Sequence, residues 1–344
     1  MSPRVTVVIP NWNGERFLSL CLGSLRQQSF RDFETVLVDN SSTDSSVAFV
    51  SRNFPEVRTL SLDENKGFSA AVNAGIRASR SEYVALLNND TEANPGWLEA
   101  LVRAAGSHPE AGHFASKLVD FQNRLLLDGA GDALRRSGLP YRLGHGELDH
   151  GQYNSLAFVF GACAAAALYR RSTLDEVGLF DEDFFAYCED GDLSFRAQLA
   201  GYRCLYVPDA IVYHVGSAST GGKRSMTATR LGTQNGVNLL VKNLPATIAW
   251  RSLPSLLAGQ LSRIVFTSFS STGLQAHLSG LAGAWHLSSR MFKKRKEIQN
   301  QRRVSDSYVR QLLRESSRQA IESRRRRVRD QIRLRFRRRS SRSS

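Results

Sequence analysis

The chain has 344 residues, of which 42% are hydrophobic and 23% are charged, an ordinary composition for a globular protein with a large core. The net charge of +14 is uneven, because residues 1–289 carry 25 Lys and Arg against 27 Asp and Glu, whereas residues 290–344 carry 21 against 5. The basicity therefore belongs to the tail and is no argument that the body binds nucleic acid. The four cysteines show no Cys-x-x-Cys spacing, which argues against a disulfide framework.

The first 90 residues alternate strand and helix patterns. We expect strands at 5–9, 35–38, 57–62 and 83–87, and helices at 15–27, 44–49 and 69–78. Short strands that alternate with helices are typical of βαβ units. The sequence therefore predicts an α/β fold with a mostly parallel central sheet flanked by helices.

Each of these expected strands is followed by polar residues. Asn and Asp recur in the four segments 10–14, 39–44, 63–68 and 88–91. One such segment alone is typical of a turn. Ligands of open α/β sheets bind beyond the carboxyl ends of the strands, however, so four polar strand ends predict one polar crevice.

The middle of the chain is less regular. Residues 106–155 are rich in Gly, His and Arg and are expected to form loops and hairpins, and 157–168 is a small apolar stretch. A strand is expected at 204–207, extended by 211–215 to His214, and a mobile Ser/Gly/Thr loop at 217–223.

A run of acids, Glu189, Asp190 and Asp192, follows the aromatic residues of Phe184-Phe185-Ala186-Tyr187. General-base catalysis needs an ionised, oriented carboxylate beside a sheltered substrate, and this run offers one. The same acids also suit the first turn of a capped surface helix. The run alone leaves both interpretations open, but the polar crevice would give a base its substrate.

The C-terminal third changes in character. Residues 244–290 combine large apolar residues with isolated arginines, which is typical of helices that lie at an interface. Residues 264–289 lack Asp, Glu, Lys and Arg, but their many polar residues argue against a transmembrane helix. From Met291 we expect an arginine-dense helix or coil with a disordered end. Nucleic-acid attraction or a solubilising role would also explain this tail.

Six linked motifs, in this order, resemble glycosyltransferase family 2 over about residues 4–240. They are Val7-Val8-Ile9-Pro10-Asn11-Trp12-Asn13-Gly14, Val38-Asp39-Asn40-Ser41-Ser42-Thr43-Asp44, Asn65-Lys66-Gly67-Phe68-Ser69-Ala70-Ala71-Val72-Asn73-Ala74-Gly75, Leu86-Leu87-Asn88-Asn89-Asp90-Thr91, Gly161-Ala162-Cys163, and the stretch 178–193. Any one of these motifs would be weak evidence, but their common order and spacing are specific. No P-loop and no Gly-x-Gly-x-x-Gly follows the first strand, which argues against nucleotide hydrolysis and hydride transfer.

The resemblance implies a GT-A fold, a nucleotide-sugar donor, a divalent metal (Mg²⁺ or Mn²⁺) and inversion at the anomeric carbon. It places Asp39 against the nucleotide base and Asp90 at the last acid of the family's Asp-x-Asp metal motif, with His214 as a further ligand. The first acid position of that motif is Asn88, one carboxylate short of the usual pattern. The expected donor-binding residues are Pro10, Asn11, Asn13, Asp39, Asn65, Gly67, Asn73, Asn88 and Asn89.

The resemblance also assigns the acid run. Asp190 matches the catalytic base, and Glu189 is the alternative. The start of a helix favours an ionised acid there, whereas the neighbouring acids oppose ionisation. Phe185, Tyr187 and Asp192 are expected to contact the acceptor.

Within the family, the motifs are similar to the bacterial rhamnosyltransferase branch, which implies L-rhamnose from dTDP-rhamnose and a lipid-linked or cell-envelope glycan acceptor. The expected organisation is a GT-A domain over 1–243, an amphipathic membrane-associating helical region over 244–300 and an Arg-rich, partly disordered tail over 301–344. We expect a cytoplasmic enzyme held at the inner membrane face by anionic lipid, with no nucleic-acid partner. A UDP- or GDP-sugar transferase and a non-catalytic nucleotide-sugar-binding scaffold are the alternatives. A processive synthase is disfavoured because clear membrane spans are missing.

Overall fold

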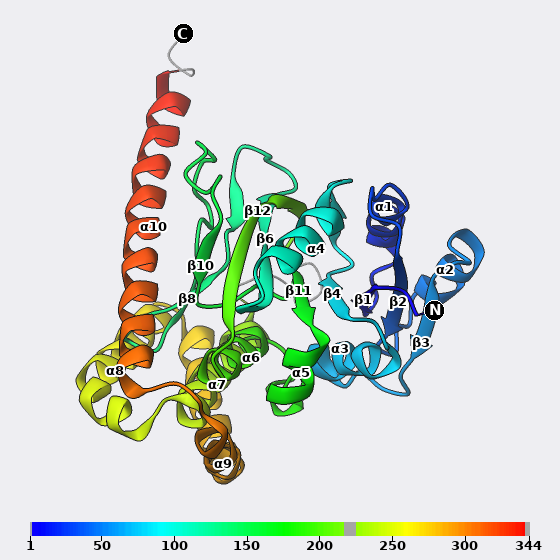
Figure 1. Ribbon diagram of the computed structural model, residues 1–344. Coiled ribbons are helices and arrows are strands. Elements are labelled where there is room, and N and C mark those ends of the chain that lie inside the picture. The colour runs from blue at the N-terminus through cyan, green and yellow to red at the C-terminus, as the bar shows by residue number, and fades with distance from the viewer. Residues whose placement is uncertain (1, 217–224, 341–344) are drawn as a thin grey trace.

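The computed structural model describes residues 2–216 and 225–340 (Figure 1). The expected loop at 217–223 lies outside these residues. The first half contains β1 (Val5–Asn11), α1 (Glu15–Arg26), β2 (Phe33–Asp39), α2 (Ser46–Asn53), β3 (Arg58–Ser61), α3 (Gly67–Ala78), β4 (Tyr83–Leu87), β5 (Thr91–Ala93), α4 (Trp97–Ser107), β6 (Ala111–Asp120), β7 (Leu127–Gly129), β8 (Asp132–Leu134), β9 (Pro140–Arg142), β10 (Ala157–Val159) and β11 (Ala166–Arg170). The second half contains α5 (Arg171–Val177), the 3-10 turn Glu182–Phe184, α6 (Glu189–Leu199), β12 (Arg203–His214), α7 (Met226–Asn243), α8 (Ala246–Thr267), α9 (Ser271–Gln301) and α10 (Asp306–Ser340).

One sheet runs through the body of the molecule in the order β10-β12-β6-β11-β4-β1-β2-β3. The pairs β1–β2, β1–β4, β2–β3 and β6–β12 are parallel, whereas β11 is antiparallel to both β4 and β6. The predicted α/β fold with a mostly parallel sheet is therefore confirmed. All seven elements expected in the first 90 residues are present within a few residues of their predicted bounds.

Helices cover both faces of the sheet because successive side chains of a strand point to opposite faces. Val7 and Ile9 of β1 join one core cluster with Leu18 of α1, and the same cluster includes Trp97 of α4. Val8, between them in the sequence, joins the other cluster with residues of α3. This two-sided burial leaves the carboxyl edge of β1, β2 and β4 as the open part of the sheet.

The prediction of loops and hairpins over 106–155 is wrong in one respect. β6 is a strand of 10 residues in the middle of the sheet, and nine of them are buried. Its Gly, His, Ser and Lys conceal the strand pattern. Two of the polar side chains have partners: Ser116 accepts from Trp97 Nε1 at 2.9 Å, and Lys117 Nζ lies 2.6 Å from Asp149. Tertiary contacts thus override a weak local preference.

The C-terminal helices pack onto the body that contains the sheet. A third core cluster joins Phe160 and Phe195 of the body to Leu239 of α7, Met291 of α9 and Val309 of α10. In Figure 1, α10 stands beside β8 and β10, at the opposite end of the molecule from α2. Among the described helices, none is both long and apolar enough to cross a bilayer.

Side chains of α10 satisfy backbone amides of the segment around β8 and β9. Ser316 Oγ accepts from Leu134 N at 2.7 Å, and Ser323 Oγ accepts from Gly144 N at 3.0 Å. Asp330 accepts from Leu148 N at 3.0 Å. The side chains of α10 therefore supply acceptors for backbone amides of this two-stranded unit, which a neighbouring strand would otherwise supply.

Candidate active site

The ends of β1, β2 and β4 meet in a buried polar cluster. Asn11 donates from Nδ2 to Asp39 Oδ1 at 3.1 Å, and its own Oδ1 accepts from Asn89 Nδ2 at 2.8 Å. Ser42 N donates to the other Asp39 oxygen at 3.1 Å. The structure thus brings these three predicted residues together, and it keeps the Asp39 carboxylate oriented beside the loop that follows β2.

Two further loops border this cluster. Asn13 Oδ1 accepts from Thr43 N at 2.7 Å, so Asn13 ties the loop after β1 to the loop after β2. Asn65 Oδ1 accepts from Gly67 N at 3.0 Å. Gly67 has a φ of 84°, and a Cβ there would lie 2.6 Å from Phe185, so only glycine allows this contact.

Asn73 and Pro10 are placed less directly. Asn73 donates to Phe180 O at 2.8 Å and to Glu182 at 2.9 Å, and its own Oδ1 accepts from Phe180 N at 3.0 Å. With these bonds formed inside the protein, Asn73 holds the segment before the acid run rather than facing the crevice. Pro10 lies within β1, opposite Val38, and positions the next residue, Asn11.

A row of polar groups follows β4. The Oδ1 atom of Asn88 is buried and has no hydrogen-bond partner among residues 2–216 and 225–340. Asp90 Oδ1 lies 3.5 Å from His214 Nε2, while His214 Nδ1 lies 2.7 Å from Asp128. Burial lowers the pKa of His214, but the two carboxylates outweigh it and raise the pKa to about 9. His214 is therefore held between two acids, with one ring nitrogen directed at Asp90.

The acid run begins α6. Asp190, in the first turn, accepts from Ala164 N at 3.3 Å. Glu189 is buried, and its Oε2 has no partner in the described part of the chain. Burial raises the pKa of Glu189 well above its usual range, and the charge of Asp190 raises it further. Asp190 is half-buried and so remains the accessible acid of the pair.

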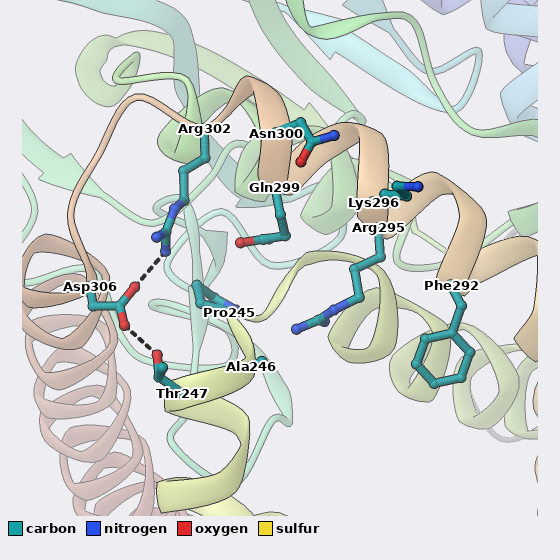
Figure 2. Close-up of a pocket in the computed structure, with 10 residues that line it drawn as sticks. All are labelled: Pro245, Ala246, Thr247, Phe292, Arg295, Lys296, Gln299, Asn300, Arg302 and Asp306. Carbon is teal, nitrogen blue, oxygen red and sulfur yellow. Dashed lines mark hydrogen bonds and ion pairs between the residues drawn. The ribbon is translucent and has the colours of Figure 1, made fainter.

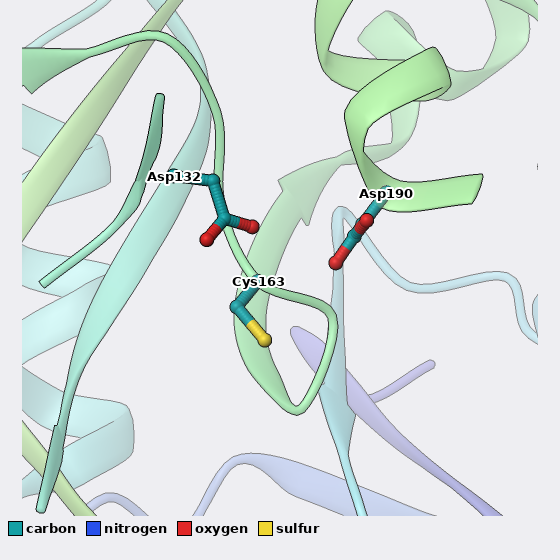
Figure 3. Close-up of side chains that lie close together, drawn as sticks. All are labelled: Asp132, Cys163 and Asp190. Atoms are coloured by element: carbon teal, nitrogen blue, oxygen red, sulfur yellow. The ribbon is translucent and has the colours of Figure 1, made fainter. Parts of the chain in front are cut away.

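Cys163 of the fifth motif and two groups that the sequence did not single out, Asp132 and Arg142, lie around Asp190. Ligand atoms of Asp132, Cys163 and Asp190 lie within 4.8 Å of one another (Figure 3). Arg142 Nη2 donates to Cys163 Sγ at 2.7 Å, and Arg142 Nη1 lies 3.3 Å from Asp128. Because Asp128 also bonds His214, charged groups connect Asp90 to the surroundings of Asp190.

The aromatic approach to α6 has an unusual backbone. Phe185, Tyr187 and Cys188 have φ values of 60°, 73° and 66°, in the left-handed region that disfavours side chains. Asn235 of α7 donates to the carbonyls of Phe184, Ala186 and Tyr187 at 2.7, 2.9 and 2.8 Å. The amide of Asn235 therefore fixes the loop that carries the two predicted aromatic acceptor contacts.

Comparison with known proteins decides the family. The model of glycosyl transferase family 2 matches residues 6–178, half of the chain, and this match includes the loops after β1, β2 and β4. The chain belongs to glycosyltransferase family 2. It is a glycosyltransferase similar to rhamnosyltransferases, as the motifs predicted.

Two relatives in Mycobacterium tuberculosis illustrate the likeness. The chain is 29% identical over 245 residues to an N-acetylglucosaminyl-diphospho-decaprenol L-rhamnosyltransferase, covering 64% of this chain and 79% of that one. It is 32% identical over 222 residues to a pre-mycofactocin glycosyltransferase, covering 61% of this chain and 42% of that one.

Solved structures confirm the GT-A fold. A mannosyltransferase of Pyrobaculum calidifontis in complex with GDP-Man and Mn²⁺ aligns with a TM-score of 0.54 at 17% identity, covering 93% of this chain and 86% of that one. S. aureus TarS 1–349 in complex with UDP-GlcNAc aligns with a TM-score of 0.56 at 18% identity, covering 87% and 91%. At such identities the likeness concerns the fold of the glycosyltransferase and not its substrates.

Asp192, the third expected acceptor contact, does not lie at the surface. Asp192 is fully buried, with Lys242 Nζ at 2.8 Å, Arg196 Nε at 3.0 Å and Asn243 Nδ2 at 2.7 Å. Residues two apart on a helix point to different faces, so Asp192 cannot share the exposed face of Asp190. In this glycosyltransferase it anchors α6 to α7.

The hollow between the start of α8 and the end of α9 is not the active site of the glycosyltransferase. Figure 2 shows it lined by Thr247, Phe292 and Arg295, among others, with an ion pair of 2.6 Å between Arg302 and Asp306. None of the family motifs contributes a residue to this hollow.

Sequence reasoning missed Asp128, Asp132, Arg142 and Asn235. The first three lie on strands of three residues each, and the fourth lies inside a helix. A period-2 pattern cannot be recognised in three residues. The available signal was the charge itself, since Asp128, Asp132 and Arg142 form a compact group in a loop-rich stretch beside the site of a glycosyltransferase.

Proposed function

We propose that this glycosyltransferase transfers a sugar, with inversion, from a nucleotide-sugar donor to a hydroxyl of a lipid-linked or cell-envelope glycan. One observation carries the proposal: a single backbone turn touches both halves of the site. Ala164 N donates to Asp190, and the carbonyl of the following residue, Ala165, accepts from Asn88 N at 2.9 Å. The proposed base therefore lies next to the loop that carries Asp90.

In the proposed reaction, Asp190 takes the proton of the acceptor hydroxyl. The hydroxyl oxygen forms a bond to the anomeric carbon while the bond from that carbon to the nucleoside diphosphate breaks on the opposite face, which inverts the configuration. Asp190 lies in the first turn of α6, at the positive end of the helix dipole. The bond from Ala164 N fixes the carboxylate in place.

The residues after β4 fit a divalent metal such as Mg²⁺ or Mn²⁺. Asp90, the Nε2 atom of His214 and the partnerless Oδ1 of Asn88 would hold it, all of them ordinary ligand atoms. The metal would take the place of the proton on Nε2, because a histidine ligand must be deprotonated at the atom that binds. Asp128 orients His214 from the other ring nitrogen, as carboxylates do for metal-binding histidines. When bound, the metal would neutralise charge on the departing diphosphate.

The favoured donor is dTDP-rhamnose, and the favoured acceptor is a sugar on a polyprenyl diphosphate. The similarity to the mycobacterial rhamnosyltransferase supports both choices. A UDP- or GDP-sugar donor is the alternative. The asparagine at position 88, where the family usually has an acid, favours as second candidate a scaffold that binds nucleotide sugars without transfer.

We further propose that the region 244–300 holds this enzyme at the cytoplasmic face of a membrane. Five exposed apolar residues of α8 recur every three or four positions and so share one face; they are Trp250, Leu253, Leu257, Leu261 and Val265. Trp285 of α9 is 82% exposed. Apolar residues at the lipid interface together with the positive tail suit an anionic bilayer.

A panel of nucleotide sugars tests the enzymatic proposal. We expect dTDP-rhamnose, with Mn²⁺ or Mg²⁺, to raise the thermal unfolding midpoint and to support transfer to a short-chain prenyl diphosphate sugar. Asp190→Asn should reduce transfer by about 10²- to 10⁴-fold and leave donor binding nearly unchanged. Unchanged turnover in this variant would refute the mechanism, and donor binding without any turnover in the unaltered enzyme would favour the scaffold.

Flotation on vesicles of phosphatidylglycerol and phosphatidylethanolamine tests the membrane proposal. The full chain should float, and a variant with Trp250, Leu257 and Leu261 all changed to Ser should not. Equal flotation of both forms would show that the apolar face of α8 does not hold the enzyme at the membrane. Lys293→Ser and Lys296→Ser, which change charge outside the α8 face, provide the comparison.

A further inference from the structure

Asp132 is held rigidly beside the proposed base. Its backbone exchanges two hydrogen bonds with Gly161, Asp132 N to Gly161 O at 2.8 Å and Gly161 N to Asp132 O at 3.2 Å. Gly161 begins the segment that includes Cys163 and Ala164, and Ala164 bonds Asp190. The positions of Asp132 and Asp190 are therefore fixed by the same short piece of backbone.

The Asp132 carboxylate lies close to Asp190, and its closest cation is beyond hydrogen-bond distance. Its nearest cation, Arg142 Nε, lies 3.6 Å away, longer than a hydrogen bond. The side chain is 18% exposed, so a ligand in the crevice can reach it. Arg142 therefore pairs with this carboxylate through charge, and the carboxylate oxygens keep acceptor capacity for a ligand in the crevice.

A metal ion is the less suitable occupant for this group. Arg142 already places its guanidinium among Asp128, Asp132 and Cys163, and it donates to Cys163 Sγ at 2.7 Å. A divalent cation at the same point would face that positive charge. A neutral donor does not, and sugar hydroxyls are the neutral donors that a glycosyltransferase brings next to its base.

We propose that Asp132 is a second substrate-binding carboxylate of the transfer site, which accepts a hydrogen bond from a sugar hydroxyl adjacent to the reacting centre. Arg142 positions it. The hydroxyl belongs either to the donor sugar or to the acceptor sugar, which share this chemistry. The assignment rests on the sugar transfer proposed above. It would make Asp132 a determinant of which sugar the enzyme uses, because a sugar that lacks this hydroxyl leaves the carboxylate without a hydrogen-bond donor in the crevice.

The test compares Asp132→Ala and Asp132→Asn with the matched control Asp209→Ala, whose carboxylate is 73% exposed and pairs with Arg103. With dTDP-rhamnose and a short-chain prenyl diphosphate N-acetylglucosamine, we expect kcat/KM of Asp132→Ala to fall about 10- to 100-fold, the range of a hydrogen bond to a charged group. Asp132→Asn, which keeps an oxygen acceptor, should lose less. A rise in KM for the donor alone or for the acceptor alone identifies the sugar that carries the hydroxyl.

Thermal unfolding of each variant separates this role from a structural one. If Asp132→Ala lowers the unfolding midpoint strongly, the assignment is judged on Asp132→Asn, which preserves the shape of the side chain. Unchanged kcat/KM and unchanged KM values in both variants of an active enzyme would overturn the assignment of Asp132 alone. No turnover by the unaltered chain with dTDP-, UDP- or GDP-sugars would overturn the proposed function together with it.

Discussion

His214 and Asp128 form a fixed pair, with Nδ1 of the imidazole 2.7 Å from the carboxylate. The pair directs the other ring nitrogen, Nε2, toward Asp90 at 3.5 Å. Neither position of the pair is free to adjust, because both side chains are buried and Asp128 is also bound by Arg142. The geometry is that of a histidine oriented for a ligand on the side of Asp90.

Asp128→Asn should weaken metal binding without removing a proposed ligand. An amide is a weaker acceptor for the imidazole N–H, so His214 becomes a poorer and less well oriented ligand. We expect the affinity for Mn²⁺, measured by calorimetric titration in the presence of dTDP, to fall about 10- to 100-fold. Asp209→Asn, far from the site, should leave it unchanged. An unaltered affinity in Asp128→Asn would argue that His214 is not a ligand.

Glu189 should not be the base. Burial and the charge of Asp190 keep its pKa high, so near neutral pH it is protonated and already resembles glutamine. Glu189→Gln should therefore keep most of the transfer activity at pH 7, in contrast to Asp190→Asn. A loss in Glu189→Gln as large as that in Asp190→Asn would reassign the base.

The same shift in Glu189 affects stability. Because the folded state holds the proton more tightly than the unfolded state, the free energy of unfolding falls as the pH rises above the ordinary glutamate value of about 4.3. Glu189→Gln removes this contribution, so its free energy of unfolding should decrease less than that of the unaltered chain between pH 5 and pH 9. Urea unfolding at both pH values measures the difference.

The polar crevice could be predicted from sequence because its residues follow strands of a recognisable pattern. Val5–Asn11 and Phe33–Asp39 are buried strands of seven residues, and parallel neighbours bring Asn11 and Asp39 into register. The side chains that β8 and β9 bring to the site could not be predicted, because strands of three residues show no periodicity. The helix that holds them, α10, also lies more than 160 residues later in the chain. Long-range packing of this kind leaves little local signal.

Asp192 shows a second limit of prediction from the sequence. The family resemblance implies that Asp192 contacts the acceptor, but helix geometry turns it inward, where Lys242 and Asn243 of α7 bond it. Those partners lie 50 and 51 residues further along the chain. The sequence thus locates the acid run, whereas only the packing of α7 separates an acid with a structural role from the proposed base.

Asp192→Asn should therefore act on stability. Burial alone would raise the pKa of Asp192, but Lys242 and Arg196 outweigh it and lower the pKa to about 2. Removing one partner of a buried ion pair costs about 3–5 kcal/mol. At pH 7 we expect a loss of that order in the free energy of unfolding, and Asp209→Asn should change it little. Ionised Asp192 stabilises the fold only at pH values above the pKa that the carboxyl has in the unfolded chain, about 4. The loss of stability in Asp192→Asn should therefore shrink as the pH falls from about 4 toward the folded-state pKa of about 2.

Asn235 should control the loop before α6. Three carbonyls of a loop with left-handed residues depend on its single amide, and Asn235→Ala leaves them without that donor. We expect a loss of about 1–3 kcal/mol in stability and a rise in the KM for the acceptor. Asn235→Asp, which presents a carboxylate to the same carbonyls, should be at least as damaging. A KM that stays constant in both variants would show that the loop does not bind the acceptor.

The helix α10 should be needed for activity even where no membrane is present. Ser316 and Ser323 accept the amides of Leu134 and Gly144, and so hold the unit of β8 and β9 that carries Asp132 and Arg142. Ser316→Ala together with Ser323→Ala leaves two buried amides unpaired, at a cost of about 1–3 kcal/mol each.

Transfer to a water-soluble acceptor should therefore fall in this double variant along with transfer to a lipid-linked one, since the defect lies in the site. Changes to the exposed apolar residues of α8 should instead lower transfer to the lipid-linked acceptor alone. Ser255→Ala, an exposed serine of α8, is the matched control for the serine changes. Full activity of the double variant on the soluble acceptor would mean that α10 is not part of the catalytic unit, and its role would then have to be sought at the membrane.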